Sequence, residues 1–429
     1  MRWALADVRP LLVSVAFAAA ALVPSVSRAQ DESALAPYIM LRSLQFVQDT
    51  VVVGDHSAAE MQRFMLNKID QRLRSAPSST FDDPRNVDAA LIYAMSGGNP
   101  ATLEYLVDRD ISGNFDTRVA DALRKYLAGK GTLIAASLGQ MATEYRDQRI
   151  GAYIALVSGN VTVPKDPVGA LQFYDMARLA APGTIVEEAA LRRSVAIAVD
   201  ADLVEKGLGY ARKYARRFIH SPYAGQFADF FVQLVVEHYP RVGEADIDGT
   251  IAFMDAERRR EVFLRIARSA AVQGKNELAR LASSKAAGLS GLEPGTPETL
   301  AKLYGELANI PTPNVGEAVE GLAQISDEQL SPRDRALRQA AHFVAEEVLR
   351  QPVAESLAQD RDRTMLTTPD ADTEIASPGD DVPGPAATEP PPLASSNVKM
   401  DPELQSFVET GRSKLSAIDD LLKEEGVRP

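Results

Sequence analysis

Helix starts of one type recur along this chain. A residue that can accept a hydrogen bond stands directly before proline, ahead of an apolar helical pattern, at Asp83-Pro84, Asn99-Pro100, Asp166-Pro167, Ser221-Pro222, Thr296-Pro297, Ser331-Pro332 and Asp401-Pro402. The first residue can cap free backbone N–H groups, and proline fits the first helical position because no N–H is needed there. Apolar residues at 3.6-residue spacing follow each pair. Strand signals are confined to 51–53 and 160–163, so the sequence predicts an all-α fold.

The segment 165–184, KDPVGALQFYDMARLAAPGT, indicates how consecutive helices are joined. Its apolar stripe consists of Ala170, Phe173, Tyr174, Ala177, Ala180 and Ala181. Pro182-Gly183 ends the helix, and Thr184 with Glu187 predicts a capping box that starts the next helix at once. Two helices joined by so short a loop are expected to pack antiparallel.

The spacing of these helix starts suggests a loose repeat. Asn99-Pro100 and Asp166-Pro167 lie 67 residues apart, close to twice the ~34 residues of a tetratricopeptide unit. Segments 205–214 and 274–282 resemble second helices of such units. We expect irregular stacked helical hairpins, a tetratricopeptide- or Sel1-like α-solenoid, with a compact helical bundle as the alternative. Stacked hairpins present long faces that suit protein binding.

The N-terminus has the composition of a secretion signal. Arg2 and Arg9 precede the apolar run 11–23, and Ser27-Arg28-Ala29 offers small residues for a signal peptidase. The run is shorter than the ~20 residues of a membrane-spanning helix. We expect a signal peptide over 1–29 and a periplasmic mature protein without a membrane span. An uncleaved membrane anchor is the alternative.

The mature chain is expected to be acidic. The full chain has 46 basic and 59 acidic side chains; the signal segment holds three of the former and one of the latter, which leaves 43 and 58, or a net charge of −15. This charge argues against nucleic-acid binding and against adhesion to anionic lipid. The chain has no cysteine, which excludes disulfides and thiolate chemistry.

The C-terminal part differs from the predicted helical-repeat domain, 30–363. Segment 364–399 contains seven prolines and six acids with no base before Lys399, which predicts a disordered linker. Segment 400–429 is expected to form a tethered helix. Its heptad stripe consists of Leu404, Val408, Gly411, Leu415, Ile418 and Leu422. We interpret it as a helix that docks on a partner; folding back onto its own helical domain is the alternative.

A second candidate binding surface is basic. In the segment 210–220, one helical face is expected to carry Arg212, Lys213, Arg216 and Arg217, and the opposite face Ala211, Tyr214, Ala215 and Phe218. We interpret the four basic residues as a docking patch for an acidic partner or for the protein's own acidic linker. The alternative is an ordinary solvated face with intrahelical ion pairs.

Candidate reactive residues are few. The four histidines are too far apart for a zinc motif, and His56 in a turn is more simply interpreted as part of a helix cap than as a base. Loop 128–132, AGKGT, lacks the first glycine of a P-loop. Glu355-Ser356 resembles the catalytic pair of lytic transglycosylases, but the linker begins eight residues later, which leaves no room for their catalytic domain. We expect no catalytic, cofactor or metal site.

Three segments together resemble one known family: residues 166–194 (DPVGALQFYDMARLAAPGTIVEEAALRRS), 51–70 (VVVGDHSAAEMQRFMLNKID) and 96–107 (SGGNPATLEYLV). They look like the MotC family, periplasmic motility proteins of rhizobia and related α-proteobacteria. The resemblance covers the chain from about Ala36 to Gln351.

The resemblance implies a non-enzymatic accessory of the flagellar motor. Members of the family are exported, associate with the periplasmic part of the stator protein MotB and are needed for flagellar rotation. The family offers no catalytic motif, so no site residues are carried over. From the residues alone, two alternatives stay open: a peptidoglycan-processing enzyme built on a helical scaffold, and a general envelope scaffold unrelated to motility.

Overall fold

The structure, a computed structural model, describes residues 35–115, 117–289 and 295–350. These ranges contain α-helices, three short 3-10 helices and no strand, so the predicted all-α class is confirmed. The chain divides into two units, Met1–Gln351 and Pro352–Pro429, and every described residue lies in the first.

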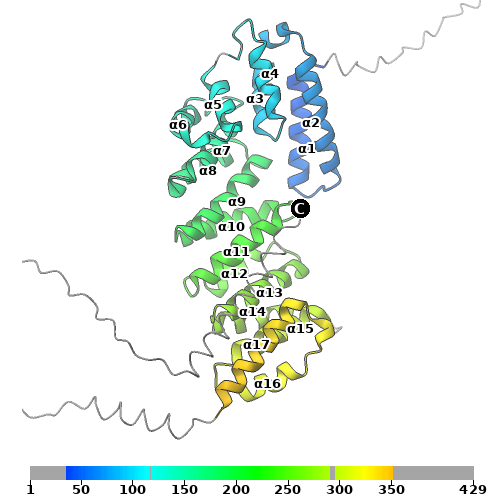
Figure 1. The fold of residues 1–429 in the computed structure, drawn as a ribbon, viewed down its shortest axis with the longest axis vertical. Coiled ribbons are helices and arrows are strands. Elements are labelled where there is room, and N and C mark those ends of the chain that lie inside the picture. Colours follow the sequence, from blue (N-terminus) through cyan, green and yellow to red (C-terminus); the bar gives the residue numbers. More distant parts are fainter. Residues whose placement is uncertain (1–34, 116, 290–294, 351–429) are drawn as a thin grey trace, which may run out of the picture. The chain divides into compact units, whose positions relative to one another are not determined.

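The elements follow one another with short connections (Figure 1). The first half contains α1 (Pro37–Val52), α2 (Ala58–Ser75), η2 (Ser78–Asp82), α3 (Pro84–Met95), α4 (Pro100–Asp108), α5 (Arg118–Leu127), η3 (Gly131–Leu133), α6 (Ala135–Glu144), α7 (Gly151–Thr162) and α8 (Pro167–Ala180). The second half contains α9 (Ile185–Asp200), α10 (Val204–Phe218), α11 (Ala224–His238), α12 (Glu244–Ile251), α13 (Ala256–Val272), α14 (Asn276–Gly288), α15 (Thr296–Asn309), α16 (Val315–Ala323), η4 (Asp327–Gln329) and α17 (Pro332–Leu349).

Four of the predicted helix starts are confirmed. Asp83, Asn99, Asp166 and Ser331 are the N-caps of α3, α4, α8 and α17, and each side chain accepts a hydrogen bond from a backbone N–H of the first turn. Proline follows each cap as the first helical residue. Local chemistry alone therefore fixes these boundaries.

Two sequence expectations about helix starts differ from the structure, and a third is not tested by it. Ser221-Pro222 lies in a turn, because Ser221 Oγ accepts from the N–H of Tyr223 at 3.2 Å, and α11 begins only at Ala224. Thr296 is itself the first residue of α15, after the N-cap Gly295. A serine or threonine hydroxyl can close a short turn as readily as it caps a helix. Asp401-Pro402 lies outside the described residues.

The predicted capping box of α9 is half present. Thr184 Oγ accepts from the N–H of Val186 at 3.2 Å and so caps the helix. The Glu187 carboxylate, however, accepts from the N–H of Gly183 at 2.6 Å and not from that of Thr184. It also pairs with Arg217 of α10. An interhelical ion pair therefore replaces the reciprocal bond of the motif.

The later helices form stacked hairpins. Sequential helices such as α9 and α10, or α13 and α14, pack against each other. In addition, α9 contacts α11, α11 contacts α13, α13 contacts α15, and α15 contacts α17 (Figure 1). Contacts to the first and second neighbour along the chain show a stack of helices. The tetratricopeptide- or Sel1-like form of this stack stays a prediction.

Small residues allow close packing between the helices. A Cβ atom at Gly159 of α7 would lie 2.5 Å from the Tyr174 ring of α8, so glycine is needed for this approach. On α8, Ala170 and Ala177 are fully buried, whereas Ala180 of the predicted stripe is exposed. The buried apolar residues form one continuous core from Met40 to Ala345.

Candidate functional site

A groove lies between α1 and the ends of α7 and α8. It has a volume of about 840 Å³. Its lining residues come from α1, the α6–α7 loop, α7, α8 and the α8–α9 loop: Gln45, Asp49, Arg146, Asp147, Gln148, Arg149, Ala152, Tyr153, Met176, Leu179, Ala180, Ala181, Pro182 and Thr184. We call this feature the α1–α8 groove. The groove forms because α1 contacts helices that follow much later in the sequence.

Two hydrogen bonds hold α1 in this position. An Asp49 carboxylate oxygen accepts from the N–H of Ile185 at 3.0 Å, which adds a second acceptor to the N-terminus of α9. Gln45 Nε2 donates to the hydroxyl of Tyr153 on α7 at 2.8 Å. A carboxylate is favoured at a helix N-terminus because the first N–H groups lack partners there. These bonds position the groove walls.

The groove combines apolar surface with charges of both signs. Burial raises the pKa of the Asp49 carboxyl, while the hydrogen bond from Ile185 acts in the opposite direction. Within the α6–α7 loop, Arg146 Nε lies 3.7 Å from Asp147 Oδ1. Leu179 is 67% exposed, and Phe46, next to Gln45 on α1, is 69% exposed. Leu179 therefore contributes exposed apolar surface to a groove that is otherwise rimmed by charged residues.

The basic face predicted on α10 has the expected orientation. Arg212, Lys213, Arg216 and Arg217 are exposed. The four residues predicted for the opposite face, Ala211, Tyr214, Ala215 and Phe218, are buried. The helical spacing of the sequence therefore correctly separated the two faces.

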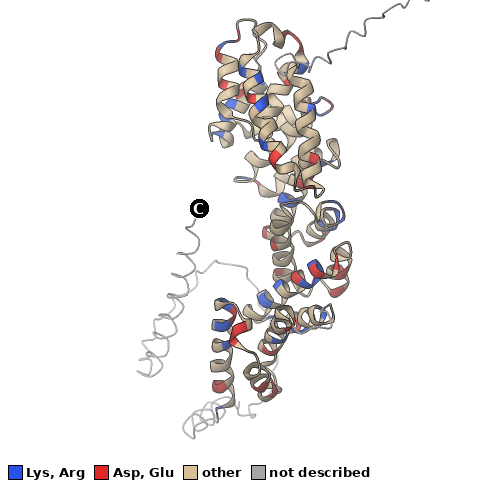
Figure 2. Ribbon diagram, turned by 90° about the vertical axis from the view of Figure 1, so that its right-hand side faces the viewer, with Lys and Arg blue, Asp and Glu red and all other residues tan. Residues whose placement is uncertain are grey.

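The basic residues of α10 are partly neutralised by neighbouring helices. Arg212 pairs with Asp246 of α12 at 2.7 Å, and Arg217 pairs with Glu187 of α9 at 2.5 Å. The ion pairs are thus interhelical, whereas the alternative had placed them within the helix. Figure 2 shows basic and acidic residues interspersed along the described helices. A role of this face in docking stays a prediction.

Beneath the basic face lies a buried polar cluster that joins α9, α10 and α11. Glu188 and Arg192 form an ion pair at 2.9 Å, and the hydroxyl of Tyr214 donates to Glu188 at 2.8 Å. Arg192 also donates to the Gln226 side chain at 2.5 Å. We call these four residues the Glu188 cluster. Tyr214 in turn stacks on Phe227, with ring centroids 4.1 Å apart.

The protonation states of Arg192 and Tyr214 are compatible with their hydrogen bonds in the Glu188 cluster. Burial would lower the pKa of Arg192, but Glu188 raises it above its ordinary value. The pKa of Tyr214 is raised by burial and by the adjacent Glu188. Arg192 therefore stays charged and Tyr214 stays neutral, so Tyr214 can donate to Glu188. The cluster is structural in character, because its members satisfy one another.

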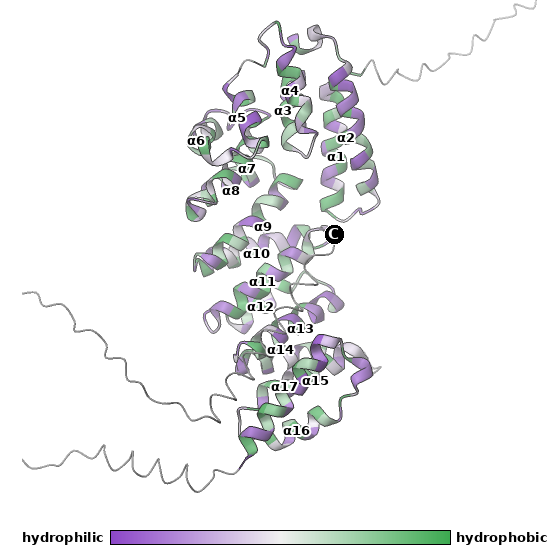
Figure 3. Ribbon diagram, in the orientation of Figure 1, coloured by the Kyte–Doolittle hydropathy of each residue, from purple (hydrophilic) through white to green (hydrophobic). Residues whose placement is uncertain are grey.

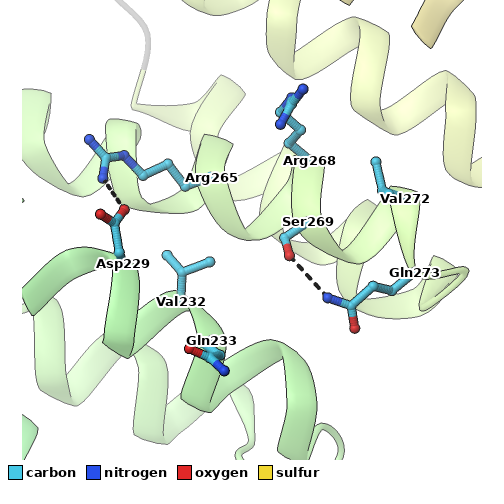
Figure 4. A pocket seen from close by; sticks show the side chains of 8 residues that line it. All are labelled: Asp229, Val232, Gln233, Arg265, Arg268, Ser269, Val272 and Gln273. Carbon is cyan, nitrogen blue, oxygen red and sulfur yellow. Dashed lines mark hydrogen bonds and ion pairs between the residues drawn. The ribbon is translucent and has the colours of Figure 1, made fainter. Parts of the chain in front are cut away.

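Another groove, of about 330 Å³, lies between α11 and α13 (Figure 4). Arg265 of α13 reaches Asp229 of α11 at 2.7 Å across one end. At the other end, the Gln273 amide donates to the Ser269 hydroxyl at 3.3 Å. These side chains already pair with each other, so the groove offers little to a ligand.

Two of the sequence's reactive candidates lie in connections between helices. His56 is exposed in the α1–α2 connection, where Asp55 accepts hydrogen bonds from the N–H and hydroxyl of Ser57. Loop 128–132 joins α5 to η3 and α6. No group of three His, Cys, Asp or Glu side chains that could hold a metal occurs within residues 35–350 as described.

Several predicted features lie outside the described residues. They are the signal peptide, Glu355, the acidic linker, and the heptad positions Leu404, Val408, Leu415, Ile418 and Leu422. None of the helices that the structure describes combines the length and apolar character needed to cross a bilayer.

Comparison with known proteins identifies the family to which this fold belongs. The fold defines an all-α protein of stacked helices with a groove where its first helix meets α7, α8 and α9. The family model "Chemotaxis protein MotC" matches residues 3–427. A chemotaxis protein MotC of Rhizobium meliloti (strain 1021) is 51% identical over 419 residues, covering 95% of this chain and 96% of that protein. No solved structure matches.

The chain therefore belongs to the MotC family. This membership makes it a protein of chemotaxis and motility, and it confirms the resemblance seen in the sequence.

Proposed function

We propose that this protein is a non-enzymatic periplasmic accessory of the flagellar motor that binds the periplasmic part of the stator protein MotB and is needed for rotation. The observation that carries the proposal is the match to the MotC family along almost the whole chain. The signal-like segment 1–29 supports export. The α1–α8 groove supplies a surface of the kind that binds a protein segment.

The mechanism we propose is a shift of a conformational equilibrium. A segment of the stator subunit binds in the α1–α8 groove, where Leu179 and Met176 supply apolar contact. Binding favours the active, wall-engaged state of the stator only if the groove binds that state more tightly than the inactive one. Segment 400–429 adds a second tethered contact, which raises the effective concentration of the partner.

The test combines binding and motility. Leu179→Asp places a charge in the groove and is expected to weaken capture of the periplasmic part of MotB about tenfold or more, the size of an interface hot spot. Swimming in soft agar should fall in parallel. Leu133→Asp is the matched control, because Leu133 is 79% exposed and does not line the groove. Circular dichroism verifies that both variants are folded.

Other results would contradict the proposal. Equal binding and swimming for the two variants would exclude the groove as the MotB site. A deletion strain that assembles flagella and swims normally would favour a general envelope scaffold. A band cleared on a peptidoglycan zymogram and lost in Glu355→Gln would indicate a wall-processing enzyme. Capture from periplasm by the full chain and by a chain ending at Arg363 measures the contribution of the tail.

A further inference from the structure

The exposed side of α10 is almost entirely basic. Its exposed side chains are Glu205, Lys206, Arg212, Lys213, Arg216 and Arg217. In Figure 3 hydrophilic and hydrophobic residues alternate along α10, the pattern of a helix with one buried and one exposed side. The exposed side thus has five cations and one carboxylate, on a chain that is acidic overall.

Three of these cations have no carboxylate partner. Arg212 and Arg217 pair with neighbouring helices, as described above. For Lys206, Lys213 and Arg216, no described carboxylate lies within ion-pair distance. The Lys213 ammonium reaches only the backbone carbonyl of Gly209, one turn earlier in its own helix, at 3.2 Å. The charge of these three side chains is therefore not neutralised within the described chain.

The carboxylates next to α10 already have cations. Asp175 of α8, which accepts a hydrogen bond from the Tyr210 hydroxyl, pairs with Arg178 at 2.6 Å. Asp202, just before α10, pairs with Arg241. Only Glu205, on α10 itself, offsets part of the excess. Three unpaired cations less this carboxylate leave a local surplus of two positive charges.

The stability of α10 explains only one of the three unpaired cations. Arg216 lies in the last turn, where a positive charge interacts favourably with the helix dipole. Lys206 lies in the first turn, where the N–H groups disfavour a positive charge, and no side chain caps this end of the helix. Lys213 lies in between, so the dipole has little effect on it.

We propose that Lys206, Lys213 and Arg216 bind a carboxylate-rich segment of another protein; we call these three residues the α10 cation row. Steps of seven and three residues keep them on one side of the helix. The row spans ten residues, or about 15 Å along the helix axis. An extended chain covers that length with about five residues. The partner segment is therefore extended and carries several Asp or Glu side chains within about five residues.

A short segment fits this row better than a broad anionic surface does. At physiological salt, charges more than about 8 Å apart are largely screened, so a short segment interacts with the row and little with the net charge of the chain. A bilayer or a nucleic acid would also meet the acidic residues of α12, such as Glu244 and Asp248. The local excess of cations thus favours an acidic peptide as the ligand.

Fluorescence anisotropy with a labelled peptide of six glutamates tests the proposal. The chain from Gln30 to Pro429 is expected to bind this probe in low-salt buffer and to release it as salt is added, because exposed ion pairs are screened. A peptide of six glutamines should not bind. The triple variant Lys206→Gln, Lys213→Gln and Arg216→Gln should bind about tenfold more weakly, the size expected for three exposed ion pairs.

A second triple variant is the matched control. Arg42→Gln, Arg63→Gln and Lys130→Gln remove the same charge at exposed positions of α1, α2 and the α5–η3 connection. None of these side chains has a described carboxylate partner either. The control should bind hexaglutamate within about twofold of the wild type. Circular dichroism of both variants verifies that they are folded.

Several outcomes would overturn the proposal. Equal losses in the two triple variants would show a general effect of charge, and absence of hexaglutamate binding at low salt would exclude the row. Binding seen only when the chain ends at Arg363 would make the protein's own acidic segment the ligand. Row-dependent binding to phosphatidylglycerol vesicles without peptide binding would indicate lipid. The groove variant Leu179→Asp does not alter the row, so failure of the MotB proposal leaves this test unaffected.

Discussion

Helices α1–α9 and α9–α17 are connected in different ways. In the first region α1 contacts α9 and α3 contacts α7, through bonds such as that between Asp49 and Ile185. In the second region the main contacts reach only the first or second neighbouring helix along the chain. The first region therefore contains contacts between helices that are far apart in the sequence. The second region is held together by contacts between helices that are close in the sequence.

The two regions are expected to differ in how many helices lose stability when one contact is removed. In a stack of near-neighbour contacts, stability is roughly a sum of local terms, and a weakened helix affects its neighbours. In the first region, loss of the contacts between α1 and α9 affects helices at both ends of the segment α1–α9. The Glu188 cluster lies where the two regions meet, on α9, α10 and α11.

The largest effect is expected at this junction. Glu188→Ala leaves Arg192 buried without its carboxylate, which should lower the free energy of unfolding by about 3–5 kcal/mol. Urea unfolding followed by circular dichroism measures the change. Asp229→Ala is the control, because it breaks an exposed pair with Arg265 worth less than about 1 kcal/mol. Similar losses for the two variants would show that the cluster does not connect the regions.

A smaller effect is expected where α1 ends. Gly54 has φ +122°, and a Cβ atom there would lie 2.8 Å from Cβ of His220, just after α10. Gly54→Ala should therefore cost about 1–3 kcal/mol and increase hydrogen exchange in α1, α2 and α10. Gly97→Ala is the matched control, since Gly97 also has positive φ but no atom within 4 Å of the added Cβ. Faster exchange in α13–α17 would contradict the separation of the two regions.

The smallest effect is expected in the pH dependence of stability, through Asp49 and its hydrogen bond to Ile185. Burial raises the pKa of Asp49 in the folded chain. The folded state then binds a proton more readily than the unfolded state, so this group's contribution to stability improves as pH falls through the folded pKa toward the unfolded value. Asp49→Asn keeps an oxygen acceptor for Ile185 but does not titrate.

The variant should therefore gain most over the wild type at neutral pH, and the gain should shrink in mildly acidic buffer. Thermal unfolding of both proteins across this range provides the measurement. A difference that is independent of pH would show that the Asp49 carboxyl is not perturbed in the fold.

Local features of the fold could be predicted from the sequence. The caps Asp83, Asn99 and Asp166 act on N–H groups two or three residues away, so their pattern is visible in the chain itself. The exposed and buried faces of α10 likewise follow from helical spacing. Ser221-Pro222 shows the limit, because the same residue pair that starts a helix elsewhere closes a turn there.

The candidate site could not be predicted in this way. The partner of Asp49 is the backbone N–H of Ile185, 136 positions away, and a backbone group carries no sequence signature. The groove depends on this contact, since its walls come from α1 and from α7 and α8. Phe46 and Leu179 could be recognised as exposed only once the neighbours of α1 and α8 were known.

The contact between α1 and α9 also affects the order in which parts of the chain can fold. Ribosomes make α1 before the other described helices, but its Asp49 must wait for Ile185 before this bond can form. Each helix after α9 meets a neighbour soon after it is made. Helix α1 can pack on α2 and α3 as soon as these are made, but the α1–α8 groove is complete only after α9 has formed.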